Sequence, residues 1–175
     1  MDEIVNKVQQ SGLTEINLED YYDQTPRVCV DMKDYLTEIP VGESNAYILK
    51  EKNFREQLNL LQREQFEAKL VAIFCSVDAI IPTWAYMLIC LSISEMAKKV
   101  VVGSIETLDN IVFNEAIQKI NPSDYSNAKV IIKGCNKYNI PLNAYAAFAA
   151  KIKPYAKSIM FGEPCSTVPL YKKPK

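Results

Sequence analysis

The residues with the most evident chemistry are the five cysteines, at positions 29, 75, 90, 135 and 165. The chain of 175 residues contains no histidine, which excludes Ser-His-Asp and Cys-His catalysis and every metal site with a histidine ligand. An odd number of cysteines behind a charged N-terminus that is not a signal peptide argues against a disulfide framework. Each thiol is therefore interpreted as a core residue, a metal ligand or a nucleophile.

Composition narrows the classes of protein further. Apolar residues make up 49% and charged residues 23%, as in an ordinary globular protein, and the net charge of −1 argues against nucleic acid as a partner. Five glycines are too few and too scattered for a phosphate loop or a dinucleotide fingerprint. The longest apolar run, residues 79–91, is too short to span a bilayer. We expect a single domain over residues 1–175, in the cytoplasm, that binds neither nucleic acid nor membrane.

The second part of the chain has the pattern of an α/β protein. Apolar runs at 70–74, 100–102, 130–132 and 159–161 alternate with helical patterns near 83–97, 107–120 and 143–156. β-Branched runs separated by helices predict a mostly parallel sheet that is buried on both faces. The more polar residues 1–68 predict an N-terminal α+β extension, and residues 166–175 are interpreted as a solvated tail or a docking strip.

Two stretches of this second part resemble each other. The segment VAIFCSVDAIIPTWAY (71–86) aligns with VIIKGCNKYNIPLNAY (130–145). From Pro82 and Pro141 onward the alignment runs without a gap at 59 positions, whereas Cys75 and Cys135 are 60 apart. We interpret this as a duplicated strand–helix–strand unit, with repeat one at 69–104, a connecting helix in 105–127 and repeat two at 128–165. Right-handed crossovers then predict the spatial strand order 2-1-3-4 over residues 69–165.

That strand order predicts a cysteine site. Cys75 and Cys135 would end neighbouring strands where the winding of the sheet reverses, and the loop holding Cys165 would fold over the same edge. Three thiolates with an open fourth position suit zinc or an iron–sulfur cluster. The other candidates at this rim are the possible fourth ligand Asp78, the side chains of Ser76, Trp84 and Ser166, and the glycines where a ligand could approach the backbone, Gly103, Gly134 and Gly162.

Three functions remain open from these residues. The first is binding of a thiophilic metal or iron–sulfur cluster through Cys75, Cys135 and Cys165. The second is a thiol-dependent sulfur carrier or transferase with Cys135 or Cys165 as the nucleophile. The third is a non-catalytic interaction scaffold in which the cysteines only pack. Whether the protein is an enzyme, and whether it forms a homodimer, are left open.

The chain also resembles a small bacterial family described only as a domain of unknown function. The resemblance rests on EIVNKVQQSGL, CSVDAIIPTWAYML, VIIKGC and KSIMFGEPCSTVPLYKKPK, which together extend over nearly the whole chain. The family is associated with gene neighbourhoods for iron–sulfur cluster assembly. This resemblance implies an accessory role in cluster biogenesis beside a protein partner of that pathway, and it identifies no catalytic residue.

Overall fold

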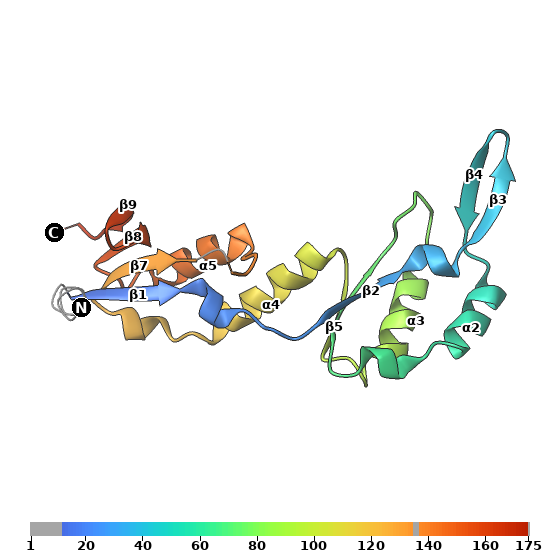
Figure 1. The fold of residues 1–175 in the computed structure, drawn as a ribbon, viewed down its shortest axis with the longest axis horizontal. Coiled ribbons are helices and arrows are strands. Elements are labelled where there is room, and N and C mark those ends of the chain that lie inside the picture. Colours follow the sequence, from blue (N-terminus) through green and yellow to red (C-terminus); the bar gives the residue numbers. More distant parts are fainter. Residues whose placement is uncertain (1–11, 135–136, 175) are drawn as a thin grey trace. The chain divides into compact units, whose positions relative to one another are not determined.

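The computed structural model describes residues 12–134 and 137–174. It is a mixed α/β structure dominated by parallel strand pairs, which confirms the predicted fold class at that level (Figure 1). The chain divides into two compact units. We call Met1–Asp23 with Asn110–Lys175 the terminal unit, and Gln24–Asp109 the central unit. In the described part of the chain, no helix is both long enough and apolar enough to cross a bilayer.

The central unit is built on a parallel sheet with the order β2-β5-β6. Its strands are β2 (Arg27–Asp31), β5 (Leu70–Phe74) and β6 (Lys99–Val102). Helices α2 (Glu51–Asn59) and α3 (Thr83–Ile93) contribute to one core with the sheet, and 3-10 turns η2 (Met32–Tyr35) and η3 (Arg63–Phe66) flank the strands. Within this unit, the antiparallel hairpin of β3 (Thr37–Val41) and β4 (Ser44–Ile48) forms a separate sheet that stands away from the others (Figure 1).

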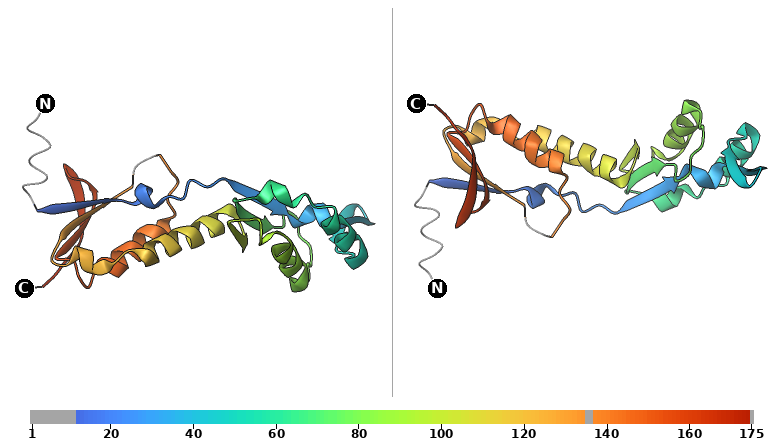
Figure 2. Two further views of the ribbon diagram at one scale, coloured as in Figure 1. Left: turned by 90° about the horizontal axis from the view of Figure 1, so that it is seen from below. Right: turned by 90° about the horizontal axis from the view of Figure 1, so that it is seen from above.

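The terminal unit has a sheet with the order β1-β7-β8-β9. Strands β1 (Leu13–Asn17), β7 (Lys129–Lys133) and β8 (Ser158–Glu163) are parallel, and β9 (Ser166–Lys172) adds antiparallel to β8. Helix α5 (Leu142–Ile152) runs along one face of these strands in both views of Figure 2. The unit boundary falls inside α4 (Ile105–Lys119), whose later turns contribute to the terminal core. The 3-10 turns here are η1 (Leu18–Tyr21) and η4 (Pro122–Tyr125).

The strand alternation explains how each sheet meets its helices. In β7, Val130 and Ile132 point to the same face and pack against Phe148 of α5 and Phe113 of α4. In β5, Val71 and Ile73 occupy the same places in a core with α2 and α3. Because these β-branched side chains are fully enclosed, they fix which face each helix must cover. Each unit is therefore a sheet with two helices on one face.

The two units have matching element positions. β5 and β7, α3 and α5, and the starts of β6 and β8 all lie 59 positions apart, and both pairs of parallel strands have the same register. Immediately before β5 and β7, Ala68 and Asn127 both adopt a left-handed backbone, with φ of 53° and 57°. Their N–H groups donate to the carbonyls of Met96 and Tyr155, which are also 59 positions apart. We use "corresponding" below for residues separated by 59 positions in these elements.

The predicted strand order 2-1-3-4 is wrong, because β5 and β7 belong to different sheets. The places beside them are taken by β2 and β1, two short strands from the N-terminal extension. Each ends in a residue that holds a 3-10 turn: Asn17 accepts a hydrogen bond from the N–H of Glu19, and Asp31 from that of Lys33. The extension therefore contributes one strand to each sheet.

One further detail differs from the sequence prediction. Residues 166–172, interpreted as part of a tail, form β9. Pro169 obscured this strand, since proline is tolerated only at sheet edges and irregularities, and β9 is an edge strand paired next to a register shift. The expected helix within 105–127 is present as α4.

The matched pair Ala68 and Asn127 gives a test of this architecture. A left-handed backbone disfavours alanine and is tolerated by asparagine, so we expect Ala68→Asn to raise the free energy of unfolding by about 0.5–1 kcal/mol. Asn127→Ala should lower it by a similar amount. Urea denaturation of the two variants measures both changes, and a loss of stability in Ala68→Asn would contradict the assigned backbone.

Candidate functional site

The cysteines of the predicted site follow strands of different sheets. Cys75 comes directly after β5 in the central unit, and Cys165 lies between β8 and β9 in the terminal unit. Cys135 lies outside the described residues. Among the residues that the structure describes, no three Cys, Asp, Glu or His side chains are grouped as a metal site. Because β5 and β7 are not sheet neighbours, the expected reason for the thiols to meet at one edge is removed.

The thiol of Cys75 has a local partner. Its S–H donates to the carbonyl oxygen of Val77 at 3.2 Å. Beside it, the carboxylate of Asp31 accepts a hydrogen bond from the N–H of Ser76 at 3.0 Å. Burial raises the pKa of Asp31, but hydrogen bonds from Ser76 and Lys33 and the charge of Lys33 outweigh burial and leave that pKa below its usual value. This arrangement ties the loop after β5 to the end of β2.

The other residues predicted at the rim do not gather around Cys75. Trp84 packs edge-on against Phe54, with ring centroids 5.7 Å apart, and the guanidinium of Arg55 lies over its ring. This makes Trp84 part of the central core. The side chains of Asp78, Ser76 and Ser166 are exposed. Gly103 follows β6 directly, Gly162 lies in β8 before the turn to β9, and Gly134 follows β7.

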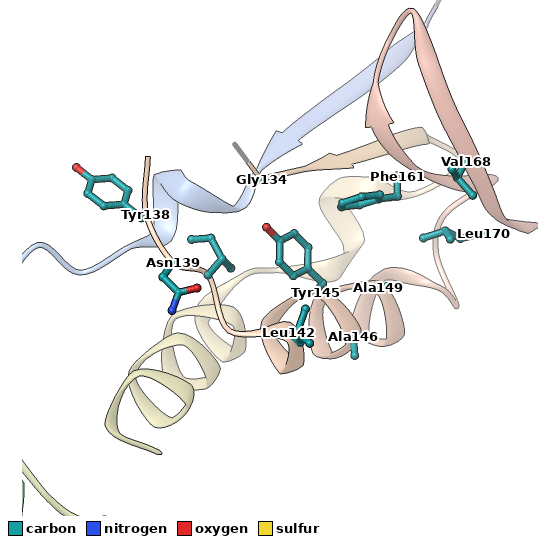
Figure 3. Close-up of a pocket in the computed structure, with 11 residues that line it drawn as sticks. Gly134, Tyr138, Asn139, Leu142, Tyr145, Ala146, Ala149, Phe161, Val168 and Leu170 are labelled. Atoms are coloured by element: carbon teal, nitrogen blue, oxygen red, sulfur yellow. The ribbon is translucent and has the colours of Figure 1, made fainter. Parts of the chain in front are cut away.

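A concave site lies in the terminal unit. A pocket of about 810 Å³ lies between α5, the loop before it and the hairpin β8–β9 (Figure 3). Its inner wall contains the rings of Tyr145 and Phe161, which meet edge to face at 5.7 Å. Val168 and Leu170 of β9 lie beside Phe161 in Figure 3, and Phe161 pairs with Val168 across the β8–β9 hairpin. The lining among the described residues is Gly134, Tyr138, Asn139, Ile140, Leu142, Tyr145, Ala146, Ala149, Phe161, Val168 and Leu170.

Polar contacts hold the loop wall of this pocket in place. The carboxylate of Glu19 accepts hydrogen bonds from the backbone N–H groups of Lys137 and Tyr138, at 2.8 and 3.1 Å. The ring of Tyr138 stacks on that of Tyr22, with centroids 4.2 Å apart and planes 6° from parallel. The wall therefore depends on residues that directly follow β1, more than 100 positions away in sequence.

Gly134 has a steric role in the pocket. The Tyr145 hydroxyl lies where a side chain at position 134 would begin, so any Cβ there would overlap the phenol. Figure 3 shows the phenol reaching from α5 to the end of β7 at this glycine. The absence of a side chain at position 134 thus sets where the tyrosine ring lies in the pocket.

The lining is uncharged. None of the described residues that line the pocket is Asp, Glu, Lys or Arg, and its polar groups come from tyrosines, Asn139 and the backbone. Two alanines of α5, Ala146 and Ala149, leave the space that larger side chains would fill. An ionised ligand would lose hydration here without gaining a counter-charge, whereas an apolar one would gain from burial.

The central unit has a pocket in the corresponding place, between α3 and β6. Its volume is about 450 Å³. Tyr86 corresponds to Tyr145 and Val102 to Phe161, whereas Met87 and Cys90 stand where the terminal unit has the two alanines. Burial, with smaller contributions from Cys75 and Asp31, raises the pKa of Tyr86, and burial also raises that of the Cys90 thiol. The bulkier lining is consistent with the smaller volume.

Sequence reasoning placed the site at the cysteines and missed most of the pocket. Gly134 was singled out as a place of close approach, and it does line the pocket. The signals that could have led to the rest are the exposed Leu142 after Pro141 and the alternation of Val168 and Leu170 around Pro169. Leu142 lies at the start of a helix to which no function was assigned, and Val168 and Leu170 lie in the segment interpreted as a tail.

Comparison with known proteins gives one match. Residues 2–173 match the model of a family described as protein of unknown function (DUF2480). No curated protein matches the chain. No solved structure matches it either.

The contact between Gly134 and Tyr145 can be tested by a double-mutant cycle. Gly134→Ala should displace the phenol and lower the free energy of unfolding by about 1–3 kcal/mol, the usual cost of overpacking. In a Tyr145→Phe background the same substitution should cost less, because the overlapping hydroxyl is gone. Equal costs in both backgrounds, measured by urea denaturation, would contradict the assigned contact.

Proposed function

The chain belongs to this family of proteins of unknown function, and we propose that it is a binding protein whose terminal unit holds a small, neutral, apolar molecule. The observation that carries the proposal is the uncharged pocket of about 810 Å³ lined by Tyr145, Phe161 and two alanines. This volume falls in the range of about 300–1,000 Å³ that small-molecule sites occupy. Edge-to-face rings on one wall favour a ligand with a flat or ring-shaped apolar part.

The comparison between the units supports this choice of site. The two pockets have corresponding positions, but in the described part of the chain only the terminal one combines small residues on the helix with side chains of an added strand, β9, next to Phe161. Val168 and Leu170 thereby add apolar surface that the central unit lacks among the described residues. The terminal pocket can therefore offer a ligand more apolar surface than its counterpart.

The proposal is tested with N-phenyl-1-naphthylamine, a neutral fluorescent probe, on the full chain. We expect saturable binding with one site per chain and a rise in fluorescence. Ala146→Met introduces the residue found at the corresponding position, Met87, and should weaken the affinity at least tenfold by filling the pocket.

The matched control is Asn143→Met, which introduces the same side chain at an exposed position of the same helix outside the pocket lining. It should leave the affinity within twofold of the wild type. Absence of saturable binding, or an affinity that Ala146→Met does not change, would refute the proposal.

We infer in addition that the two units descend from one duplicated ancestor. The support is the constant separation of 59 positions through two strands and a helix, together with the left-handed residues Ala68 and Asn127 and their matching hydrogen bonds. The duplicated part on this reading is larger than the strand–helix–strand unit of the sequence analysis, because η3 and η4 also correspond.

Binding of a thiophilic metal or iron–sulfur cluster by Cys75, Cys135 and Cys165 stays a prediction, as do the sulfur-carrier alternative, a role in iron–sulfur assembly and a cytoplasmic location. If the metal prediction holds, protein purified without oxygen should contain zinc or iron near one equivalent per chain, or show a visible cluster spectrum. Cys75→Ala and Cys165→Ala should each abolish that content, and Cys29→Ala serves as a control at an exposed cysteine. Metal-free, colourless protein that takes up neither zinc nor iron would exclude this function.

A further inference from the structure

One edge of the central sheet has no strand paired to it in the described part of the chain. In the order β2-β5-β6, β6 is an edge strand. The N–H groups of Lys99 and Gly103 donate to carbonyls of residues 69 and 73, on the β5 side. Since successive residues of a strand alternate in direction, the backbone groups of Val100 and Val102 point away from β5, to the outer edge. Such an edge of valines is a template for pairing with another strand.

The terminal unit shows how the corresponding edge is covered. There Ile159 and Phe161 of β8, which correspond to Val100 and Val102, pair with Tyr171 and Val168 of β9. The added strand runs antiparallel. No described strand takes this place beside β6.

The helix beside the open edge also differs between the units. α3 exposes Met87 and Leu91, with 59% and 70% of their surface accessible, and Val102 of β6 is 49% accessible. The corresponding positions in α5 are the exposed alanines Ala146 and Ala150. At these two matched positions the helix beside the unpaired edge therefore carries large apolar side chains and the helix beside the paired edge carries alanines, while Leu142 at the start of α5 is exposed as well. This difference points to a larger occupant in the central unit than a single strand.

We propose that the central unit is a self-association surface, in which β6 pairs antiparallel with β6 of a second copy of this chain. A two-fold axis at Val101 places Val100 opposite the second copy's Val102, so that the outward N–H and C=O groups of both residues are bonded. The same axis sets the two α3 helices on one face of a continuous sheet, where Met87 and Leu91 of each copy cover those of the other. The inference is independent of the ligand proposed for the terminal pocket.

Two observations favour a second copy over an unrelated extended segment. A segment like β9 supplies one strand, but Met87 and Leu91 lie on a helix and call for a helix against them, which a second copy brings together with its strand. The charges also allow self-pairing. In this register Lys99 lies opposite Gly103, so no two lysines of β6 face each other.

Sedimentation equilibrium of the full chain tests the association. The wild type should sediment at twice the chain mass of 19.8 kDa. Met87→Asp combined with Leu91→Asp should weaken the dimer at least 100-fold, because both charges would be buried against like charges. The matched control, Ala146→Asp combined with Ala150→Asp, changes the corresponding positions of α5 and should leave the dimer intact. Circular dichroism of both double variants verifies that they fold.

A disulfide measurement gives a second, independent readout. Val101→Cys places two thiols across the axis in a non-hydrogen-bonded pair, within reach of a disulfide, so oxidised glutathione should produce a covalent dimer. Lys99→Cys is the control, since its partner position is Gly103 and not a second cysteine. A monomeric wild type, a dimer that the α3 aspartates do not weaken, or equal cross-linking of both cysteine variants would each overturn the proposal. A monomer would leave the edge to a different partner.

Discussion

Unpaired backbone groups at the rim of a sheet need partners, and this need shapes both units. In each unit β5 or β7 has a parallel strand on both sides and its three central residues are buried, so the backbone groups that still need partners belong to the strands outside it. At one side the need is met in both units by a short strand from the N-terminal part, β2 or β1. At the other side it is met by β9 in the terminal unit alone. In the terminal unit, Val168 and Leu170 of that strand add to the lining of the pocket.

Much of the local structure could be predicted from the sequence, because it depends on local pattern. The apolar runs are the strands β5, β6, β7 and β8. Helices α3 and α5 begin directly after Pro82 and Pro141, because proline is well tolerated at the start of a helix. Pairing between strands could not be derived in the same way. It depends on which strands meet over a long sequence separation, and the competing partners β1 and β2 are five-residue strands in a polar region. The caps Asn17 and Asp31, each followed by a fully buried residue, were the available signal.

The predicted cysteine site depended on an alignment that the strands do not keep. Pairing Cys75 with Cys135 required a separation of 60, one more than the separation that the strands and helices keep. With the strand ends aligned, Cys75 corresponds to Gly134, and Ser76 corresponds to Cys135. Because of this one-residue shift, Cys75 and Cys135 are not at corresponding positions of the two units. In the terminal unit, glycine at this place leaves room for the Tyr145 hydroxyl, whereas in the central unit a thiol stands beside Tyr86.

Side-chain size at a few corresponding positions separates the two units more than their backbones do. Alanines at 146 and 149 leave space in the lining of the terminal pocket, whereas Met87 and Cys90 fill the corresponding space, and Met87 and Leu91 project apolar surface outward. A cavity large enough for a ligand and a surface large enough for a protein contact are alternative uses of the same helix face, since volume given to one is taken from the other. The same argument explains why β9 has no counterpart among the described strands of the central unit. A strand there would cover the residues that, on our reading, a second copy covers.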